Sequence, residues 1–264
     1  MLKDDYKKVV KQFDKYYETY KNDSELIRLK YNHSYKVDKL MEELGKRLNL
    51  DEEHIYLSKI IGLLHDLGRF EQVKQTDSFS DSLLDHAEYA ADYLFKDNHI
   101  RDFLDNNNYD SIIEKSIRNH NKLFIENNLS EEELFYSKMI RDMDKVDIYH
   151  QVAIRLSHKF DSLPSEEVIA CFYEGKSIPK EILKNNSDRV LVYFAFLNDI
   201  NFKESFDILE ETNNFNEYIS SIKVTKWKPF FNVIQNDARK IIEYRNDKEK
   251  IKLLRKEDNY GRTK

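Results

Sequence analysis

Apolar residues recur along this chain at intervals of three and four, the spacing of one face of an α-helix. The first such stripe runs through Leu2, Tyr6, Val9, Phe13, Tyr16 and Tyr20. Alternation with a period of two is hardly sustained anywhere, and only 5 Gly and 3 Pro interrupt the helical pattern. The pattern therefore predicts an all-α fold.

Capping residues predict where several helices begin. Ser130 followed by Glu133 has the form of a capping box. Asp51 is a candidate N-cap, and Asp110 or Ser111 indicates a further helix start. Asparagine clusters predict turns at residues 106–108, 127–128 and 213–214.

The dyad His65-Asp66 follows the apolar run of residues 60–64 and precedes the turn formed by residues 67–70. An imidazole and a carboxylate that an apolar helix carries inward both lose hydration, and a divalent cation compensates both. A buried His hydrogen-bonded to Asp is the structural alternative. Residues 72–83, the longest non-periodic stretch of this half, are expected to form a surface connection; a loop over the site is the alternative.

Four further candidate ligands lie on or beside apolar stripes. His33 opens one helical pattern, His86 opens another, and His120 closes a third. Asp144 lies four residues after Ile140, on the same helical face. Each of these residues alone is more often a satisfied core residue than a ligand. Together with the dyad they make four such His and two such Asp within the first 150 residues, and this combination indicates a metal site.

These residues divide into two overlapping ligand sets. One cation would be held by His33, His65, Asp66 and Asp144. Adding His86 and His120, with Asp66 as a bridge, gives a second site with open positions for water, which suits catalysis by an activated hydroxide. Nitrogen and oxygen ligands without thiolate favour one or two divalent transition metals per chain: manganese, iron, cobalt or zinc.

The order of these residues resembles the HD-domain superfamily of metal-dependent phosphohydrolases. The strings at residues 64–71, 85–88, 117–122 and 141–147 are similar to small stand-alone bacterial HD proteins. The resemblance covers residues from about Asn32 to Tyr149. It implies a helical bundle in which His33, His65, Asp66 and Asp144 bind one metal, with His86 and His120 as the additional ligands of the dinuclear branch.

Two branches of the superfamily provide alternatives. The cyclic-dinucleotide phosphodiesterases of the HD-GYP type have a Lys where this chain has Arg69, and no Gly-Tyr-Pro sequence occurs here. The di-iron oxygenases related to myo-inositol oxygenase use the same six ligands. Because ligands alone do not separate hydrolysis from oxygen chemistry, both a cyclic-nucleotide-type phosphodiesterase and an oxygenase acting on a small polar substrate remain open.

Cations beside the ligands favour a phosphorylated substrate. Arg69, Lys122 and Lys145 each follow a ligand closely and could reach a phosphoryl oxygen, although solvated surface charges are the alternative. Arg118 and Arg141 are weaker candidates, since helix spacing could place them outward.

We therefore expect a hydrolase of small phosphoesters, nucleotides foremost. Asp66 would hold the attacking hydroxide, and Arg69 or Lys122 would stabilise the transition state. A binding module with a structural metal site is a further alternative.

Composition limits the partners and the organisation of the 264 residues. Residues 1–160 are expected to form the HD core with an N-terminal helix, and residues 161–264 a helical extension packed on the same domain. The net charge of −6 argues against duplex nucleic acid. No apolar run approaches the roughly 18 residues of a membrane helix. Without a signal-peptide core, the protein is expected to be cytoplasmic. The oligomeric state is not indicated.

Smaller expectations concern individual residues. The single Cys171 precludes an intrachain disulfide and is expected to be a small buried hydrophobe. The clusters at residues 190–197 and 227–231 are expected to be helical core, and residues 255–264 to be frayed. The remaining histidines are expected on the surface: His54, His99, His150 and His158.

Overall fold

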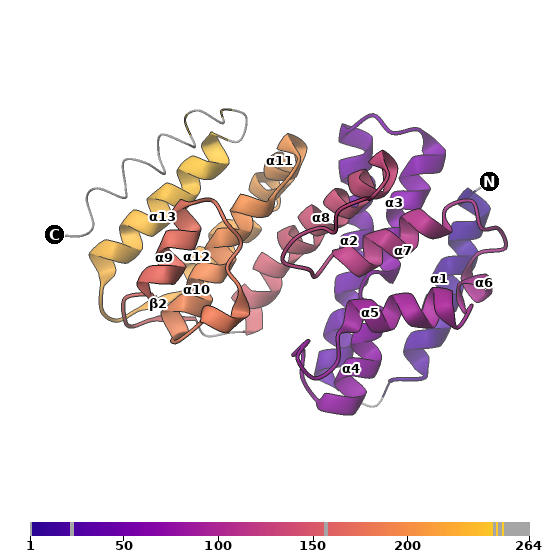
Figure 1. The fold of residues 1–264 in the computed structure, drawn as a ribbon, viewed down its shortest axis with the longest axis horizontal. Coiled ribbons are helices and arrows are strands. Elements are labelled where there is room, and N and C mark those ends of the chain that lie inside the picture. Colours follow the sequence, from indigo (N-terminus) through magenta and orange to yellow (C-terminus); the bar gives the residue numbers. More distant parts are fainter. Residues whose placement is uncertain (1, 22–23, 156–157, 245–246, 248–249, 251–264) are drawn as a thin grey trace. The chain divides into compact units, whose positions relative to one another are not determined.

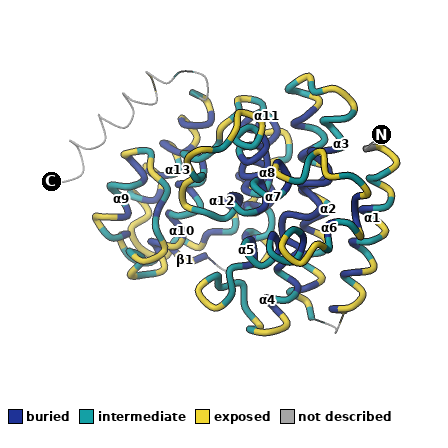
Figure 2. The backbone as a smooth tube through the Cα atoms, turned by 45° about the vertical axis from the view of Figure 1, so that its right-hand side comes forward, coloured by how far each residue is buried: buried dark blue, intermediate teal, exposed yellow. Residues whose placement is uncertain are grey.

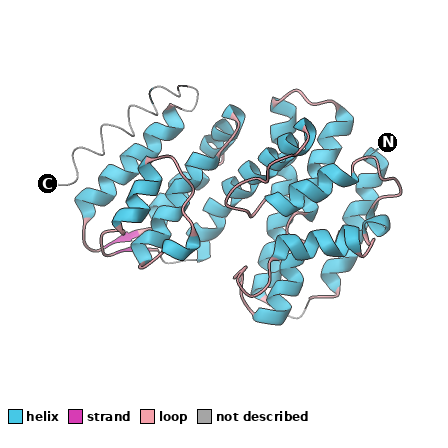
Figure 3. Cartoon of the chain, in the orientation of Figure 1, coloured by secondary structure: helices cyan, strands magenta, loops and turns pink. Residues whose placement is uncertain are grey.

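The computed structural model describes residues 2–21, 24–155, 158–244, 247 and 250. The chain divides into two compact units, Met1–Asp144 and Lys145–Lys264, which we call unit 1 and unit 2. Nearly all of the regular structure in both units is helical (Figure 3), which confirms the all-α prediction. The predicted boundary after residue 160, and the predicted packing of residues 161–264 on the first domain, stay predictions.

Unit 1 is a helical bundle (Figure 1). Its elements are α1 (Leu2–Glu18), α2 (Glu25–Arg47), α3 (Glu52–Leu64), α4 (Gly68–Thr76), α5 (His86–Ala91), the π-helix η1 (Asp92–Lys96), α6 (Ile100–Phe103), α7 (Asp110–Asn119) and the first part of α8 (Glu131–Arg155). The N-terminal stripe forms part of the core, with Val9, Phe13 and Tyr16 buried. The rings of Phe13 and Tyr16 lie 5.8 and 6.0 Å from that of Phe70 in α4.

The predicted caps at Asp51 and Ser130 are present, whereas α7 begins at Asp110 with Tyr109 as its N-cap and without a side-chain cap. Asp51 accepts a hydrogen bond from the backbone N–H of His54 at 2.9 Å and begins α3. Glu133 N–H donates to the Ser130 hydroxyl at 3.2 Å while Ser130 N–H donates to the Glu133 carboxylate at 2.8 Å, which is the reciprocal capping box. Asn128 and Asn213 adopt left-handed backbone conformations, in agreement with the predicted turns.

Two predicted boundaries were wrong. His33 does not open a helix, because α2 begins at Glu25, where the Ser24 side chain caps the Ile27 N–H. The stretch 72–83 is not all loop, since α4 continues to Thr76. Local capping and packing extend both helices beyond their clearest apolar periodicity.

Unit 2 is also helical apart from one small pair of strands. Its elements are the second part of α8, β1 (Lys159–Phe160), α9 (Glu166–Tyr173), the 3₁₀ helix η2 (Lys180–Ile182), α10 (Asn186–Ala195), the 3₁₀ helix η3 (Phe196–Asp199), α11 (Lys203–Glu211), α12 (Asn214–Ser221), β2 (Lys223–Val224) and α13 (Lys228–Glu243). The two strands pair in parallel, Lys159 opposite Lys223.

The prediction that residues 190–197 and 227–231 form helical core is confirmed only in part. Val190, Leu191 and Phe194 of α10 are buried, and Figure 2 shows the alternation of buried and exposed backbone along the helices. Phe231 of α13 is buried as well. Trp227, in contrast, precedes α13 with a left-handed backbone and is 41% exposed, so it is not a core residue.

His158 was expected on the surface and is instead buried, with its ring 5.3 Å from the ring of Tyr193 and 5.3 Å from that of Tyr218. The other three histidines of that group are partly exposed, and Cys171 is half-buried. Residues 255–264 lie outside the described residues. Within the described residues, no helix has the length and apolar content needed to cross a membrane.

Candidate metal centre

The close packing of α2 against α3 places the first two histidines together. A Cβ atom on Gly62 would lie 3.0 Å from the Cα of Asp38 and 3.0 Å from the Cγ of Met41, so a larger residue would push the helices apart. This approach brings His33, inside α2, beside His65 at the end of α3. Their Nε2 atoms are 3.3 Å apart.

A second close approach positions His86. A Cβ atom on Gly68 would lie only 2.1 Å from the backbone oxygen of His86, so the start of α4 requires glycine for α5 to begin against it. Asp85 caps α5 by accepting from the N–H groups of Ala87 and Glu88. The first residue of α5 is therefore held with its imidazole pointing inward.

His120 directly follows α7, and ion pairs connect α7 to α5 and η1. The Arg118 guanidinium pairs with Glu88, and also with Asp92 at 2.7 Å. This arrangement places the Nε2 atoms of His120 and His86 2.9 Å apart. Arg118 thus faces carboxylates of neighbouring elements and orders the helix that carries His120.

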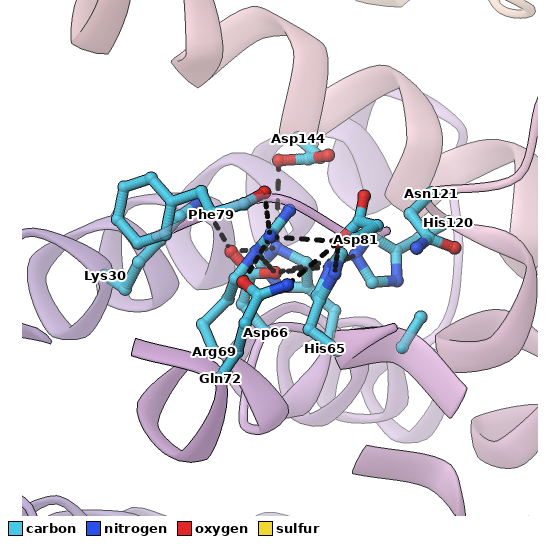
Figure 4. A network of polar contacts seen from close by, with 12 residues as sticks. Lys30, His65, Asp66, Arg69, Gln72, Phe79, Asp81, His120, Asn121 and Asp144 are labelled. Carbon is cyan, nitrogen blue, oxygen red and sulfur yellow. Dashed lines mark hydrogen bonds and ion pairs between the residues drawn. The ribbon is translucent and has the colours of Figure 1, made fainter. Parts of the chain in front are cut away.

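Asp66 lies between the two histidine pairs, with one carboxylate oxygen toward each. Figure 4 shows Asp66 within this network of polar contacts. Its Oδ2 atom is 3.4 Å from His33 Nε2 and 3.6 Å from His65 Nε2. Its Oδ1 atom is 3.1 Å from His86 Nε2 and 3.5 Å from His120 Nε2. The carboxylate therefore has the geometry of a bridge between two ligand sets.

Asp144 of α8 completes the set on the His33 side. Its Oδ1 atom is 3.0 Å from His33 Nε2 and 3.7 Å from His65 Nε2. The structure thus brings all six predicted ligands together, from α2, the end of α3, α5, the end of α7 and α8. Three overlapping triads have ligand atoms within 4.8 Å of one another: His33, His65 and Asp66; Asp66, His86 and His120; and His65, His120 and Asp144.

In three of the imidazole rings, a hydrogen bond at Nδ1, the nitrogen that faces away from the cluster, determines which nitrogen carries the proton. The Nδ1 atom of His65 lies 2.8 Å from Gly62 O, that of His120 lies 2.7 Å from Ile117 O, and that of His86 lies 2.6 Å from Asp81 Oδ1. These oxygens only accept hydrogen bonds, so each Nδ1 carries the proton. In the neutral rings each Nε2 atom therefore presents a lone pair to the centre of the cluster.

The protonation of the cluster is shaped by burial and by its charges. Burial lowers the pKa of His120 to about 4, so this ring is neutral at neutral pH. Burial by itself would raise the pKa of Asp66, but the Lys30 ammonium beside it holds that pKa well below its usual value. Burial also acts to raise the pKa of Asp144, and a hydrogen bond from His33 brings it well below its usual value. Both carboxylates are ionised.

This donor set fits a transition-metal ion. At metal–ligand bond lengths of about 2.1 Å, two ligands of one ion lie about 3.0 to 3.4 Å apart in octahedral or tetrahedral geometry. The neighbouring ligand atoms here are 2.9 to 3.7 Å apart. The Nε2 atoms of His86 and His120 face each other 2.9 Å apart, a spacing that two ligands of one cation would have. The cluster is therefore a candidate site for divalent metals.

Arg69, the first of the predicted cations, lies beside the cluster. Its Nε atom lies 3.5 Å from Asp66 Oδ1, although it makes no hydrogen bond. Its Nη1 atom donates to Gln72, to the carbonyl of Phe79 and to Asp81, at 2.6, 3.0 and 3.1 Å. These three acceptors fix the guanidinium, with its Nε edge beside the bridging carboxylate.

Two residues of the cluster were missed from sequence. Lys30 donates a hydrogen bond to Asp66 Oδ2 at 2.7 Å, and it lies one turn before His33 on the same face of α2. Asp81 accepts from the Nδ1 of His86 at 2.6 Å and so orients that ring. The signal for Lys30 was its spacing from His33; Asp81 lies in a loop without periodicity, so only its proximity to His86 in sequence pointed to it.

The other predicted cations have partners elsewhere. Lys122 lies 3.1 Å from Glu88 and 3.8 Å from Glu126, with its side chain 32% exposed. Lys145 lies 2.8 Å from Asp199, within unit 2. Arg141, a weaker candidate that helix spacing could have placed outward, is buried. It donates to the carbonyls of Asn119 and Lys122 and so orders the loop after His120.

Comparison with known proteins gives one match. The family model described as HD domain matches residues 31–149, a range that contains all six clustered ligands. No curated protein and no solved structure matches the chain.

Proposed function

Because residues 31–149 form an HD domain, a module of metal-dependent phosphohydrolases, we propose that this protein hydrolyses a small phosphoester at the cluster around Asp66. The observation that carries the proposal is the position of Asp66, which offers one oxygen to each of two histidine pairs. His33, His65 and Asp144 would complete one metal site. His86 and His120 would complete the other and leave positions for substrate.

Two divalent cations held there would activate water at neutral pH and neutralise charge on the phosphoryl group. The residues have separate tasks. Asp66 orients both ligand sets, and Asp81 holds the His86 ring. The Nε edge of Arg69 offers a planar donor to a phosphoryl oxygen. Lys122 would contact the substrate from the edge of the site, once its ion pair with Glu88 is broken.

Charge supports an anionic substrate. Asp66, Asp81 and Asp144 supply three negative charges. Lys30 and Arg69 supply two positive charges, both of which contact Asp66. Two divalent cations would leave a marked excess of positive charge in a buried site. A phosphorylated substrate balances that excess, whereas a neutral polyol does not.

A nucleotide is the substrate we place first. Leu83, 64% exposed, lies shortly before His86, and Phe124, 69% exposed, lies shortly after His120. A hydrogen bond of 3.0 Å from Asn121 to Asp85 joins these two segments. Exposed apolar side chains beside a ligand-bearing segment would suit the face of a nucleobase.

The test is phosphate release by manganese-loaded protein on nucleoside mono-, di- and triphosphates and on sugar phosphates. Metal content is measured on the same samples, and Asp66→Ala is the control. We expect release from at least one nucleotide, lowered more than about 100-fold in the variant, since even partners of metal ligands contribute 10- to 100-fold. Two bound metals without any phosphate release, together with oxygen uptake, would contradict the hydrolase and favour an oxygenase.

A further inference from the structure

Lys30 is a buried cation at the bridging carboxylate that the proposed chemistry does not use. Its ammonium lies 2.7 Å from Asp66 Oδ2, and its side chain is 8% exposed. The ring of Phe79 covers it at 5.4 Å, and the same ring lies 5.5 Å from the Arg69 guanidinium. Figure 4 shows Lys30 and Phe79 together on one side of Asp66.

The ammonium has donors to spare. The ammonium carries three N–H groups. Within the described part of the chain, it donates one hydrogen bond, to Asp66. The face of Phe79 stabilises the charge without accepting a conventional hydrogen bond. A ligand oxygen placed next to Asp66 could therefore bind Lys30 without displacing an existing partner.

The same ammonium opposes a metal ion at the His33 side. The Oδ2 atom that it contacts also faces His33 and His65, so a metal ion in that ligand set would share the oxygen with a positive charge. Water screens such repulsion only weakly where the side chains are this buried. An oxyanion that contacts both cations would remove the repulsion.

We propose that Lys30 couples metal binding to oxyanion binding: it weakens metal affinity while no anion is present and holds a phosphoryl oxygen once one is bound. This inference rests on the proposed function, since it requires the cluster to bind metal. Thermodynamic linkage makes this coupling reciprocal: phosphate and metal each increase the affinity for the other by the same factor.

The test is calorimetric titration of Mn²⁺ into the full chain, with and without inorganic phosphate. The main variant is Lys30→Gln, which keeps an N–H donor for Asp66 and removes the charge. We expect phosphate to tighten Mn²⁺ binding to the wild type on the order of tenfold or more. In Lys30→Gln, Mn²⁺ alone should bind more tightly than to the wild type, and the effect of phosphate should fall by about tenfold.

Two control variants separate charge from structure. Lys59 is also a buried lysine of unit 1, with Asp38 at 3.6 Å, Glu42 as a second partner and the Tyr6 ring at 4.8 Å. Lys59→Gln should leave Mn²⁺ affinity and its response to phosphate unchanged. Lys30→Arg keeps the charge and should retain the coupling. If Lys30→Gln does not fold, Lys30→Met takes its place, because its apolar chain fills the same space under Phe79.

The outcomes distinguish the two proposals. A wild type that binds no Mn²⁺ contradicts the proposed function and the role of Lys30 with it. A wild type that binds Mn²⁺, with a Lys30→Gln variant that binds it more weakly and keeps the full response to phosphate, overturns the role of Lys30 alone and leaves the metal site standing.

Discussion

Each unit of this protein contains a carboxylate that is completely or almost completely buried, Asp188 in unit 2 and Asp66 in unit 1. The two carboxylates interact with different kinds of neighbours. Asp188 in unit 2 accepts four hydrogen bonds from neutral donors: the N–H and hydroxyl of Ser165 and the N–H groups of Lys184 and Asn185. Asp66 in unit 1 faces two cations and four imidazole Nε2 atoms. Burial of an acid does not by itself indicate function; the nature of its neighbours does.

The difference lies in what each carboxylate leaves unsatisfied. The donors around Asp188 are backbone and hydroxyl groups that would otherwise lack an acceptor, so the carboxylate completes the capping box of α10. Around Asp66, three imidazoles carry their proton on the far nitrogen and present lone pairs. Unit 2 therefore uses its acid to fix a turn, and unit 1 has the donor atoms for a cation.

The largest expected effect concerns Asp188. Asp188→Ala would remove the carboxylate that accepts hydrogen bonds from three backbone N–H groups. Hydrogen bonds to a charged group contribute about 1.5–3 kcal/mol each, so we expect the free energy of unfolding of unit 2 to fall by about 3 kcal/mol or more. Urea unfolding followed by Trp227 fluorescence measures it, because this is the single tryptophan of the chain and it lies in unit 2. Asp66→Ala is the matched control. A loss below about 1 kcal/mol would contradict the structural role.

Metal should stabilise one unit selectively. At a free Mn²⁺ concentration of about 100 times the Kd, binding to the folded state adds about 2.7 kcal/mol to its free energy of unfolding. We expect slower amide hydrogen exchange in α3, α5 and α7, which lead to or carry His65, His86 and His120. Exchange in α10 and α13 should not change. Equal slowing of exchange in all five helices, or slowing that persists in Asp66→Ala, would contradict selective stabilisation of unit 1 by metal.

A smaller effect tests the partner of His86. Asp81→Asn removes the carboxylate that holds the imidazole Nδ1, so the affinity of the His86 side for metal should fall by about 10- to 100-fold. Asp77→Asn is the control, since Asp77 lies in the same loop, is exposed and has a left-handed backbone that Asn also adopts. Titration with Mn²⁺ should show one weakened site of two. Two weakened sites would mean that Asp81 orders the whole cluster.

Sequence reasoning reached the fold and the family because both depend on local patterns. Apolar periodicity predicted the helices, and the N-cap at Asp51 and the capping box at Ser130 are short-range signals. The order of His and Asp residues sufficed to indicate the HD domain, which the family match confirms. The convergence of the six side chains follows from that family, and the structure adds the close approaches at Gly62 and Gly68 that permit it.

What sequence reasoning missed depends on contacts between distant elements. Lys30 is a charged residue on a helix face, and its burial depends on Asp66 and Phe79, which lie far from it in sequence. His158 was expected on the surface because it lies outside the strings that resemble HD proteins, yet rings from α10 and α12 contact it on two sides. Arg141 is buried because loop carbonyls accept its hydrogen bonds, which periodicity does not record.

The smallest effect separates the two cations assigned to the transition state. Lys122 must leave Glu88 to reach a substrate, and its charge is partly hydrated, so we expect Lys122→Gln to lower kcat/KM by less than about tenfold. Arg69 is already fixed beside Asp66, and Arg69→Gln should cost about 100-fold or more. The control is Lys115→Gln, since Lys115 lies 2.7 Å from Glu126, a carboxylate that Lys122 also approaches. A 100-fold loss in Lys122→Gln would make it an equal partner of Arg69, whereas a loss no larger than that of Lys115→Gln would remove it from the catalytic set.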